Sequence, residues 1–303
     1  MSSGGTGLTD VEITTLDPER LRTVLTAGAV AGFEHMLTRG RELLDGRTFW
    51  NVNSTAQGGG VAEMLRSLIG YVRGGGVDAR WVVIEGESEF FSITKRIHNW
   101  LHGHEGDAGE LGPAQLEVYS KVTARNAEWL AERIRPDDVI LLHDPQTAGM
   151  IPRLRELAVP VVWRCHVGIY PPNDRTRAAW DFLRPFVEQA DGFVFSEAEY
   201  AWEGLDASRL TVIPPSIDAF SPKNHAMSFT GVAAVLHACG LTGEQGDHHS
   251  RAMFERLDGR VGRVNSEVTL IEDSRLSLAD PLMLQVSRWD RLKDPAGLSL
   301  IPI

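Results

Sequence analysis

The 303-residue sequence is poor in the features that mark secreted, membrane and nucleic-acid-binding proteins. Its two cysteines, Cys165 and Cys239, are too few for a disulfide framework and indicate thiols of a reducing compartment. No apolar run approaches the roughly 18 residues of a membrane span, and the first seven residues lack the basic and apolar segments of an export signal. The 30 Lys and Arg residues form no cluster and are outnumbered by 41 Asp and Glu residues. We therefore expect a packed cytoplasmic protein without nucleic-acid or membrane partners.

Six short apolar runs dominate the middle of the chain, with amphipathic stretches between most of them. The runs cover residues 49–52, 79–84, 139–142, 159–163, 192–195 and 210–213. The longest amphipathic stretch, 115–134, is predicted as a helix that ends before Pro136. This alternation predicts an α/β fold in which helices cover both faces of a parallel sheet.

The flanking segments have a different pattern. Residues 10–46 are predicted to be mainly helical, and residues 218–280 to form a connector with two or three short helices, the clearest over 231–239. A seventh apolar run at 282–286 precedes the end of the chain by too few residues to complete another domain. The predicted organisation is a helical arm (1–46), an α/β domain (47–217), the connector (218–280) and the start of a second domain (281–303).

Three contiguous glycines follow the first run, in Asn51-Val-Asn-Ser-Thr-Ala-Gln-Gly-Gly-Gly60. A strand that leads through glycines into a helix can bring backbone N–H groups and a positive helix end to an anion. The spacing is not that of the G-x-G-x-x-G dinucleotide fingerprint, and no P-loop Lys-Ser/Thr follows. A plain tight turn remains the alternative.

Polar residues also follow two later runs, at the strand ends where open α/β sheets bind ligands. In His143-Asp-Pro-Gln146, Asp144 and Gln146 can bond sugar hydroxyls, although Asp144 before Pro145 also suits a helix cap. In Trp163-Arg-Cys-His166, the Arg and His suit an anionic or hydroxyl-rich ligand, although a lone His is more often structural. We expect these groups to converge on one edge of the sheet.

A basic segment, Ser287-Arg-Trp-Asp-Arg-Leu-Lys293, follows the seventh run. Arg288 and Lys293 could clamp a diphosphate, and a solvated basic turn is the alternative. The histidines in His102-Gly-His104 and His248-His249 lack ligand spacing, so no metal site is expected. No G-x-S-x-G elbow or papain-type cysteine setting is present, which disfavours hydrolase chemistry.

Taken in order, these motifs resemble those of the trehalose glycosyltransferring synthases, which are retaining GT-B glycosyltransferases of family 4. The resemblance rests on segments 50–63, 143–146, 163–166, 212–218, 221–224 and 285–295, and it covers most of residues 45–298. Retaining trehalose phosphorylases share much of this pattern. The resemblance implies two Rossmann-like domains facing each other, the first holding acceptor glucose and the second the nucleotide sugar.

The resemblance also implies roles for individual residues. Asp144 and His166 would act at the reacting sugars, with His166 reaching the transferred glucose. Substrate binding would fall to the strand-end residues Asn53, Gly58, Gly59, Gly60, Gln146 and Arg164. Arg288 and Lys293 would hold the donor diphosphate. The NDP-glucose would be a co-substrate, and no cofactor is expected.

The sequence departs from the family pattern after about Leu298. We therefore expect a chain truncated early in the second domain, weakly active or inactive in transferring glucose from NDP-glucose to glucose with retention. A trehalose phosphorylase fragment and a non-catalytic sugar-binding module are the alternatives. A homodimer, or a separate chain that supplies the donor domain, would be the corresponding partner.

Overall fold

The structure, a computed structural model, describes residues 7–242, 252–265, 268–271, 277–281, 285–287, 293, 294 and 297. The chain forms two compact units, Met1–Ala219 and Phe220–Ile303. None of the described helices combines the length and the apolar character that a membrane crossing requires.

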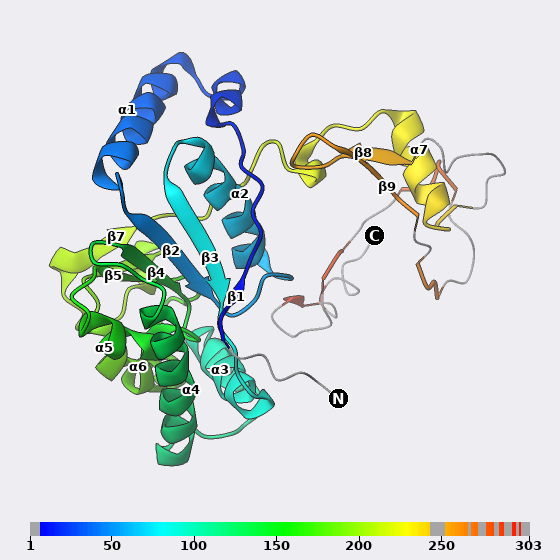
Figure 1. Cartoon of the computed structure of the whole chain (residues 1–303). Coiled ribbons are helices and arrows are strands. Elements are labelled where there is room, and N and C mark those ends of the chain that lie inside the picture. Colours follow the sequence, from blue (N-terminus) through cyan, green and yellow to red (C-terminus); the bar gives the residue numbers. More distant parts are fainter. Residues whose placement is uncertain are drawn as a thin grey trace. The chain divides into compact units, whose positions relative to one another are not determined.

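A seven-stranded sheet forms the centre of the first unit (Figure 1). Its strands, in sequence, are β1 (Thr9–Asp10), β2 (Thr48–Asn53), β3 (Asp78–Val83), β4 (Val139–His143), β5 (Val161–Cys165), β6 (Gly192–Phe195) and β7 (Leu210–Val212). They lie side by side in the order β1-β3-β2-β4-β5-β6-β7, and all pairs are parallel except β1 with β3. Each of the six predicted runs contributes one of the parallel strands.

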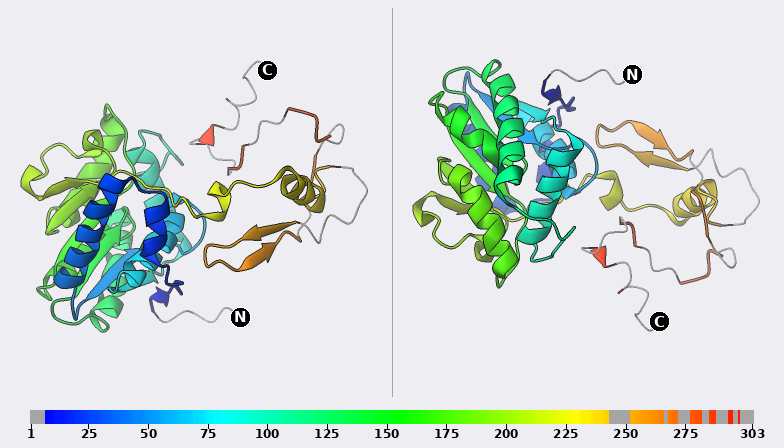
Figure 2. Two further views of the ribbon diagram at one scale, coloured as in Figure 1. Left: turned by 90° about the horizontal axis from the view of Figure 1, so that it is seen from above. Right: turned by 90° about the horizontal axis from the view of Figure 1, so that it is seen from below.

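Helices cover both faces of this sheet (Figure 2). They are α1 (Ala27–Leu43), α2 (Gly60–Gly74), α3 (Ser88–Leu101), α4 (Pro113–Ala131), α5 (Ile151–Arg155) and α6 (Asp174–Val187). The larger core packs α3 to α6 on one face, with Trp50 and Leu142 from the sheet. The smaller core packs Leu65 and Ile69 of α2 against Trp81 on the other face. The predicted α/β class with a Rossmann-like N-terminal domain is confirmed.

The N-terminal segment differs from the prediction of a mainly helical 10–46. Only α1 is an α-helix there, preceded by a 3-10 turn at Pro18–Thr23. Ahead of that turn, β1 pairs with β3 at the edge of the sheet, and the backbone N–H of Val11 donates to the backbone carbonyl of Trp81 at 2.9 Å. A two-residue strand has no hydrophobic period of its own, so pairing with a distant strand determines its conformation.

The second unit contains α7 (Phe229–Ala238) and an antiparallel hairpin of β8 (Met253–Glu255) and β9 (Val261–Arg263). A small cluster of Ala234, Ala238 and Ala252 forms its buried core. The helix confirms the one predicted at 231–239, whereas the hairpin was not predicted. Residues 282–284 of the seventh run lie outside the described residues.

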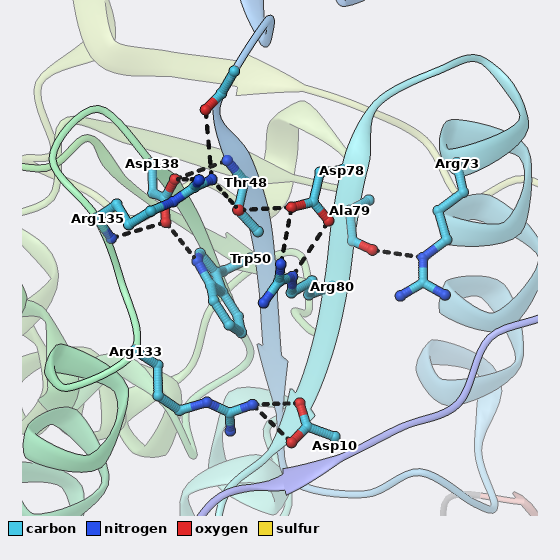
Figure 3. Close-up of polar contacts among 11 residues, drawn as sticks. Asp10, Thr48, Trp50, Arg73, Asp78, Ala79, Arg80, Arg133, Arg135 and Asp138 are labelled. Carbon is cyan, nitrogen blue, oxygen red and sulfur yellow. Dashed lines mark hydrogen bonds and ion pairs between the residues drawn. The ribbon is translucent and has the colours of Figure 1, made fainter.

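At the amino ends of the central strands, a hydrogen-bond network surrounds Asp138 (Figure 3). Its carboxylate accepts from the backbone N–H groups of Thr48 and Arg135, at 2.8 and 3.0 Å, and from the Trp50 indole at 3.0 Å. Burial alone would raise the pKa of Asp138, but these donors hold it below the usual value. The network fixes the starts of β2 and β4 relative to each other.

Candidate functional site

The sheet has its topological switch point between β2 and β4. The chain leaves β2 to form β3 on one side and returns to form β4 on the other side, so two neighbouring strands lead their connections in opposite directions. Open α/β sheets bind ligands outside the carboxyl ends of the strands at this point. The polar groups at the ends of β2, β4 and β5 therefore lie where the fold places a ligand site.

Two histidines from neighbouring strands are in direct contact at this edge. His143 Nδ1 lies 3.0 Å from His166 Nε2, and the two rings are stacked. His143 Nε2 lies 3.2 Å from Asn51 Oδ1. Burial, together with the charge of Arg164, lowers the pKa of His166 to about 3 and that of His143 well below its ordinary value. Both rings are therefore neutral at physiological pH.

Asp144 follows β4 in a left-handed backbone conformation, with φ of +63°. Its backbone N–H donates to the carbonyl of Arg164 at 2.8 Å, and its carboxylate accepts from the backbone N–H of His166 at 2.8 Å. Burial raises the pKa of this carboxyl to about 7, against the lowering effects of that hydrogen bond and of Arg164. The helix-cap alternative is wrong, since the carboxylate bonds the end of β5 instead.

Arg164 is 5% exposed and forms no ion pair among the described residues. One terminal nitrogen donates to the carbonyl of Ile213 at 3.3 Å, and its Nε has no hydrogen-bond partner in the described chain. Burial lowers the pKa of the guanidinium, and the charge of Asp144 opposes that effect. A buried cation with an unpaired N–H group is suited to an anionic or oxygen-rich ligand.

The glycine turn leads from β2 into α2, and no side chain caps this helix. Gly58 and Gly59 have φ values of +73° and +90°, which L side chains rarely adopt. A Cβ at Gly58, Gly59 or Gly60 would meet no atom within 4 Å. The first two glycines are thus explained by backbone conformation rather than crowding, and the turn leaves room beside the helix N-terminus.

The remaining predicted residues differ in their surroundings. The Trp81 indole N–H donates to Asn53 Oδ1 at 2.8 Å, and Asn53 Nδ2 donates to the carbonyl of Thr55 at 2.8 Å. Both polar atoms of the Asn53 side chain therefore have partners within the protein. Gln146 is half-buried on the loop after β4. Lys293 is exposed in the second unit, and Arg288 lies outside the described residues.

Sequence reasoning missed three residues that shape this edge. Asn51 and His143 belong to the quoted motifs, but the contacts of His143 with Asn51 and with His166 can be predicted only if it is known which strands are neighbours. Tyr119 of α4 is fully buried; its hydroxyl donates to the carbonyl of Pro145 at 2.6 Å and accepts from the N–H of Gly149 at 2.9 Å. Tyr119 thereby anchors the loop that carries Asp144. The sequence did carry one signal for Tyr119: its hydroxyl lies on the apolar face of the helix predicted at 115–134, and a buried hydroxyl needs a hydrogen-bond partner.

Metal ligation has little support in the described part of the chain, where no group of three or more His, Cys, Asp or Glu side chains could hold an ion. Cys165 is buried, Cys239 is half-buried, and both are free thiols. The groups gathered at this edge are two imidazoles with lowered pKa values, a carboxyl with a raised pKa, a buried guanidinium and backbone N–H groups.

Comparison with known proteins shows several relatives. The trehalose synthase of Pyrococcus horikoshii is 42% identical over 195 residues, covering 64% of this chain and 45% of that protein. The trehalose synthase of Rubrobacter xylanophilus is 31% identical over 261 residues, covering 84% and 52%. A trehalose phosphorylase of Pleurotus sajor-caju is 34% identical over 135 residues, covering 42% and 18%. The chain spans about half the length of the trehalose synthases it matches.

Among solved structures, a UDP-forming α,α-trehalose-phosphate synthase from Burkholderia xenovorans in complex with glucose-6-phosphate aligns with a TM-score of 0.48 at 16% identity, covering 65% of this chain and 56% of that one. The family model described as the N-terminal domain of trehalose synthase matches residues 51–202. That range holds half of the chain and runs from within β2 to beyond β6, with every strand-end group described above. The chain belongs to the family of the trehalose synthase N-terminal domain.

Proposed function

We propose that this chain is the acceptor-sugar half of a retaining hexosyltransferase, one that transfers glucose from NDP-glucose to glucose and forms α,α-trehalose. In this proposal residues 47–217 are the acceptor domain and 281–303 begin the donor domain. The proposal rests on family membership together with the names of the relatives.

The observation that carries the proposal is the set of polar groups at the switch point. Asp144, Arg164 and His166 lie at the ends of neighbouring strands and are linked through backbone hydrogen bonds. A sugar needs several donors and acceptors fixed in one place, and a rigid sheet edge supplies them. We assign the contacts with sugar hydroxyls to Asp144, His166 and Gln146.

The leaving nucleoside diphosphate gains negative charge as the transferred sugar becomes oxocarbenium-like. In the proposal, Arg164 and the N–H groups at Gly58, Gly59 and Gly60 provide positive potential for that charge. Arg288 and Lys293 are proposed as further diphosphate ligands. Asn53 is proposed to shape the turn, since its amide bonds Trp81 and Thr55.

A trehalose phosphorylase activity is the second candidate, favoured by the relative from Pleurotus sajor-caju. The two reactions share the sugars and differ in the leaving group, which is phosphate or a nucleoside diphosphate. The trehalose synthase matches have higher identity or cover more of the chain, so we place the phosphorylase second.

Calorimetric titration of the full chain with glucose, trehalose, ADP-glucose and UDP-glucose tests the proposal. We expect glucose or trehalose to bind, and Asp144→Asn to weaken that binding at least tenfold, because asparagine tolerates the left-handed backbone but lacks the charge. Asp181→Asn, an exposed change on α6, is the matched control. Absence of binding by either sugar would contradict the acceptor assignment.

An activity assay separates the candidates. Formation of trehalose from NDP-glucose and glucose supports the synthase, and phosphate-dependent trehalose cleavage supports the phosphorylase. Sugar binding without either reaction, also after adding a separate chain with the donor half, would favour a sugar-binding module.

A further inference from the structure

Asn51, His143 and His166 form a continuous chain of side-chain contacts from the interior of the sheet to the candidate site. Asn51 is 1% exposed and His143 is fully buried, whereas His166 is half-buried. The contacts run from Asn51 Oδ1 to His143 Nε2 at 3.2 Å, and from His143 Nδ1 to His166 Nε2 at 3.0 Å. The outer end of this chain is therefore His166 Nδ1.

The order of donors and acceptors follows from the first contact. A carbonyl oxygen only accepts, so Asn51 Oδ1 requires the proton of His143 to be on Nε2. A neutral imidazole carries one proton, so His143 Nδ1 is then an acceptor. It must receive the proton on His166 Nε2, and His166 Nδ1 is left with a lone pair.

A second proton on His143 would break this order, and a second proton on His166 would remove the lone pair of its Nδ1. A doubly protonated His143 would point an N–H group at the N–H group of His166. The buried guanidinium of Arg164 and the low polarity around both rings also disfavour a second proton. Within the described part of the chain, His166 Nδ1 has no hydrogen-bond partner.

We infer that Asn51 and His143 are positioning residues that fix His166 as a neutral Nε2–H tautomer, so that its Nδ1 accepts a hydrogen bond from a substrate hydroxyl. The identity of that hydroxyl as one of a sugar rests on the proposed function, whereas the tautomer does not. We call this chain of contacts, Asn51–His143–His166, the relay; it makes His166 Nδ1 a hydrogen-bond acceptor. A cationic His166 would instead compete with Arg164 for the same negative groups.

Nitrogen-15 NMR of the histidine side chains in the full chain tests the relay, because protonated and bare ring nitrogens have widely separated resonances. His166→Gln and His143→Gln assign the two rings among the ten histidines. We expect Nε2 protonated and Nδ1 bare in both rings of the wild-type protein. A protonated Nδ1 on His143 would mean that the Asn51 amide donates, and it would overturn the inference.

Asn51→Leu removes the acceptor while keeping the volume close. We expect the pair to invert, so that His143 Nδ1 donates to His166 Nε2 and the proton of His166 moves to Nδ1. Asn53→Leu is the matched control, since it removes a buried amide from the same strand without touching either histidine. Unchanged tautomers in a folded Asn51→Leu protein would contradict the relay. If that variant fails to fold, the wild-type spectrum still decides the question.

Titration with glucose links the relay to function and keeps the two claims separable. Binding should shift the Nδ1 resonance of His166 and leave its Nε2 resonance in place, and Asn51→Leu should weaken glucose binding about tenfold. The predicted tautomers without any glucose binding would retain the relay and contradict the acceptor assignment. Glucose binding with inverted tautomers would retain the acceptor assignment and overturn the relay.

Discussion

Strand β4 has an aspartate at each end, and the two carboxyl groups have opposite surroundings. Asp138, just before the strand, accepts hydrogen bonds from two backbone N–H groups and an indole. Asp144, just after it, accepts one backbone N–H. The pKa of Asp138 is lowered, whereas that of Asp144 is raised to about 7. The protein thus stabilises the charge of Asp138 with three donors and provides one backbone donor to the carboxyl of Asp144.

The two edges of the sheet therefore differ in how many hydrogen-bond donors they provide to a buried carboxyl group. At the amino edge, the donors are supplied by the ends of the strands and by the turn before β4, so the charge stabilises the fold. At the carboxyl edge, the Asp144 carboxylate has only one such donor among the described residues. The resulting cost in folding stability falls at the place where a ligand is proposed to bind. Functional sites commonly carry such a stability cost.

The largest expected effect is that of removing the charge at the amino edge. Asp138→Asn turns one acceptor oxygen into an NH₂ group that faces the N–H donors, so we expect a loss of about 3 kcal/mol in the free energy of unfolding. Urea unfolding followed by tryptophan fluorescence measures it, since seven of the eight tryptophans lie before residue 220. Asp137→Asn is the control, because Asp137 is exposed and asparagine suits its φ of +75°. A loss below about 1 kcal/mol would contradict the role assigned to these donors.

The pH dependence of that loss has a definite sign. The folded-state pKa of Asp138 lies below the unfolded value of about 3.9. The ionised carboxylate therefore contributes to the free energy of unfolding above that pH, and this contribution is lost as the pH falls through the folded-state pKa. The difference between wild type and Asp138→Asn should therefore shrink in acid.

The opposite change is expected at the carboxyl edge. Because the folded-state pKa of Asp144 is about 7, ionisation costs stability as the pH rises from about 4 to 7. Asp144→Asn removes that cost and should raise the free energy of unfolding at pH 8 by about 2 kcal/mol, with the gain disappearing near pH 4. The same variant should bind glucose more weakly. A loss of stability at pH 8 would mean that the carboxylate is better solvated than its burial indicates.

A smaller effect is expected from the neutral hydrogen bonds that hold the loop after β4. Tyr119→Phe leaves the carbonyl of Pro145 and the N–H of Gly149 without their partner, at a cost of about 1 kcal/mol. Glucose binding should weaken with it, because the loop carries Asp144. Tyr170→Phe, at a side chain that is 68% exposed, should change neither quantity. Unaltered stability in Tyr119→Phe would show that packing alone places the loop.

The sequence predicted the sheet well because each parallel strand is an apolar run that reports its own burial. It predicted the candidate edge as well, since Asp144 and His166 directly follow strands and Arg164 lies near the end of β5. The relay through Asn51 and His143 depends on β2 and β4 being neighbours, although β3 separates them in sequence. The single N–H bonded to Asp144 likewise comes from a segment distant in sequence, and so do the Thr48 N–H and the Trp50 indole bonded to Asp138. Strand order and long-range hydrogen bonds are tertiary, and no local pattern encodes them.

The smallest expected effect concerns the ion pair between Arg135 and Asp138. The side chain of Arg135 lies 3.5 Å from Asp138 but is 59% exposed, so solvent screens most of the attraction. Arg135→Gln keeps the backbone N–H that Asp138 accepts, and it should cost less than about 0.5 kcal/mol in urea unfolding. The cost should also be insensitive to added salt. A cost approaching that of Asp138→Asn, and falling with salt, would assign the stabilised charge to the ion pair rather than to the hydrogen bonds. In that case a nearby cation would account for the lowered pKa of Asp138. Asp144 also has a nearby cation, Arg164, and yet its pKa is raised.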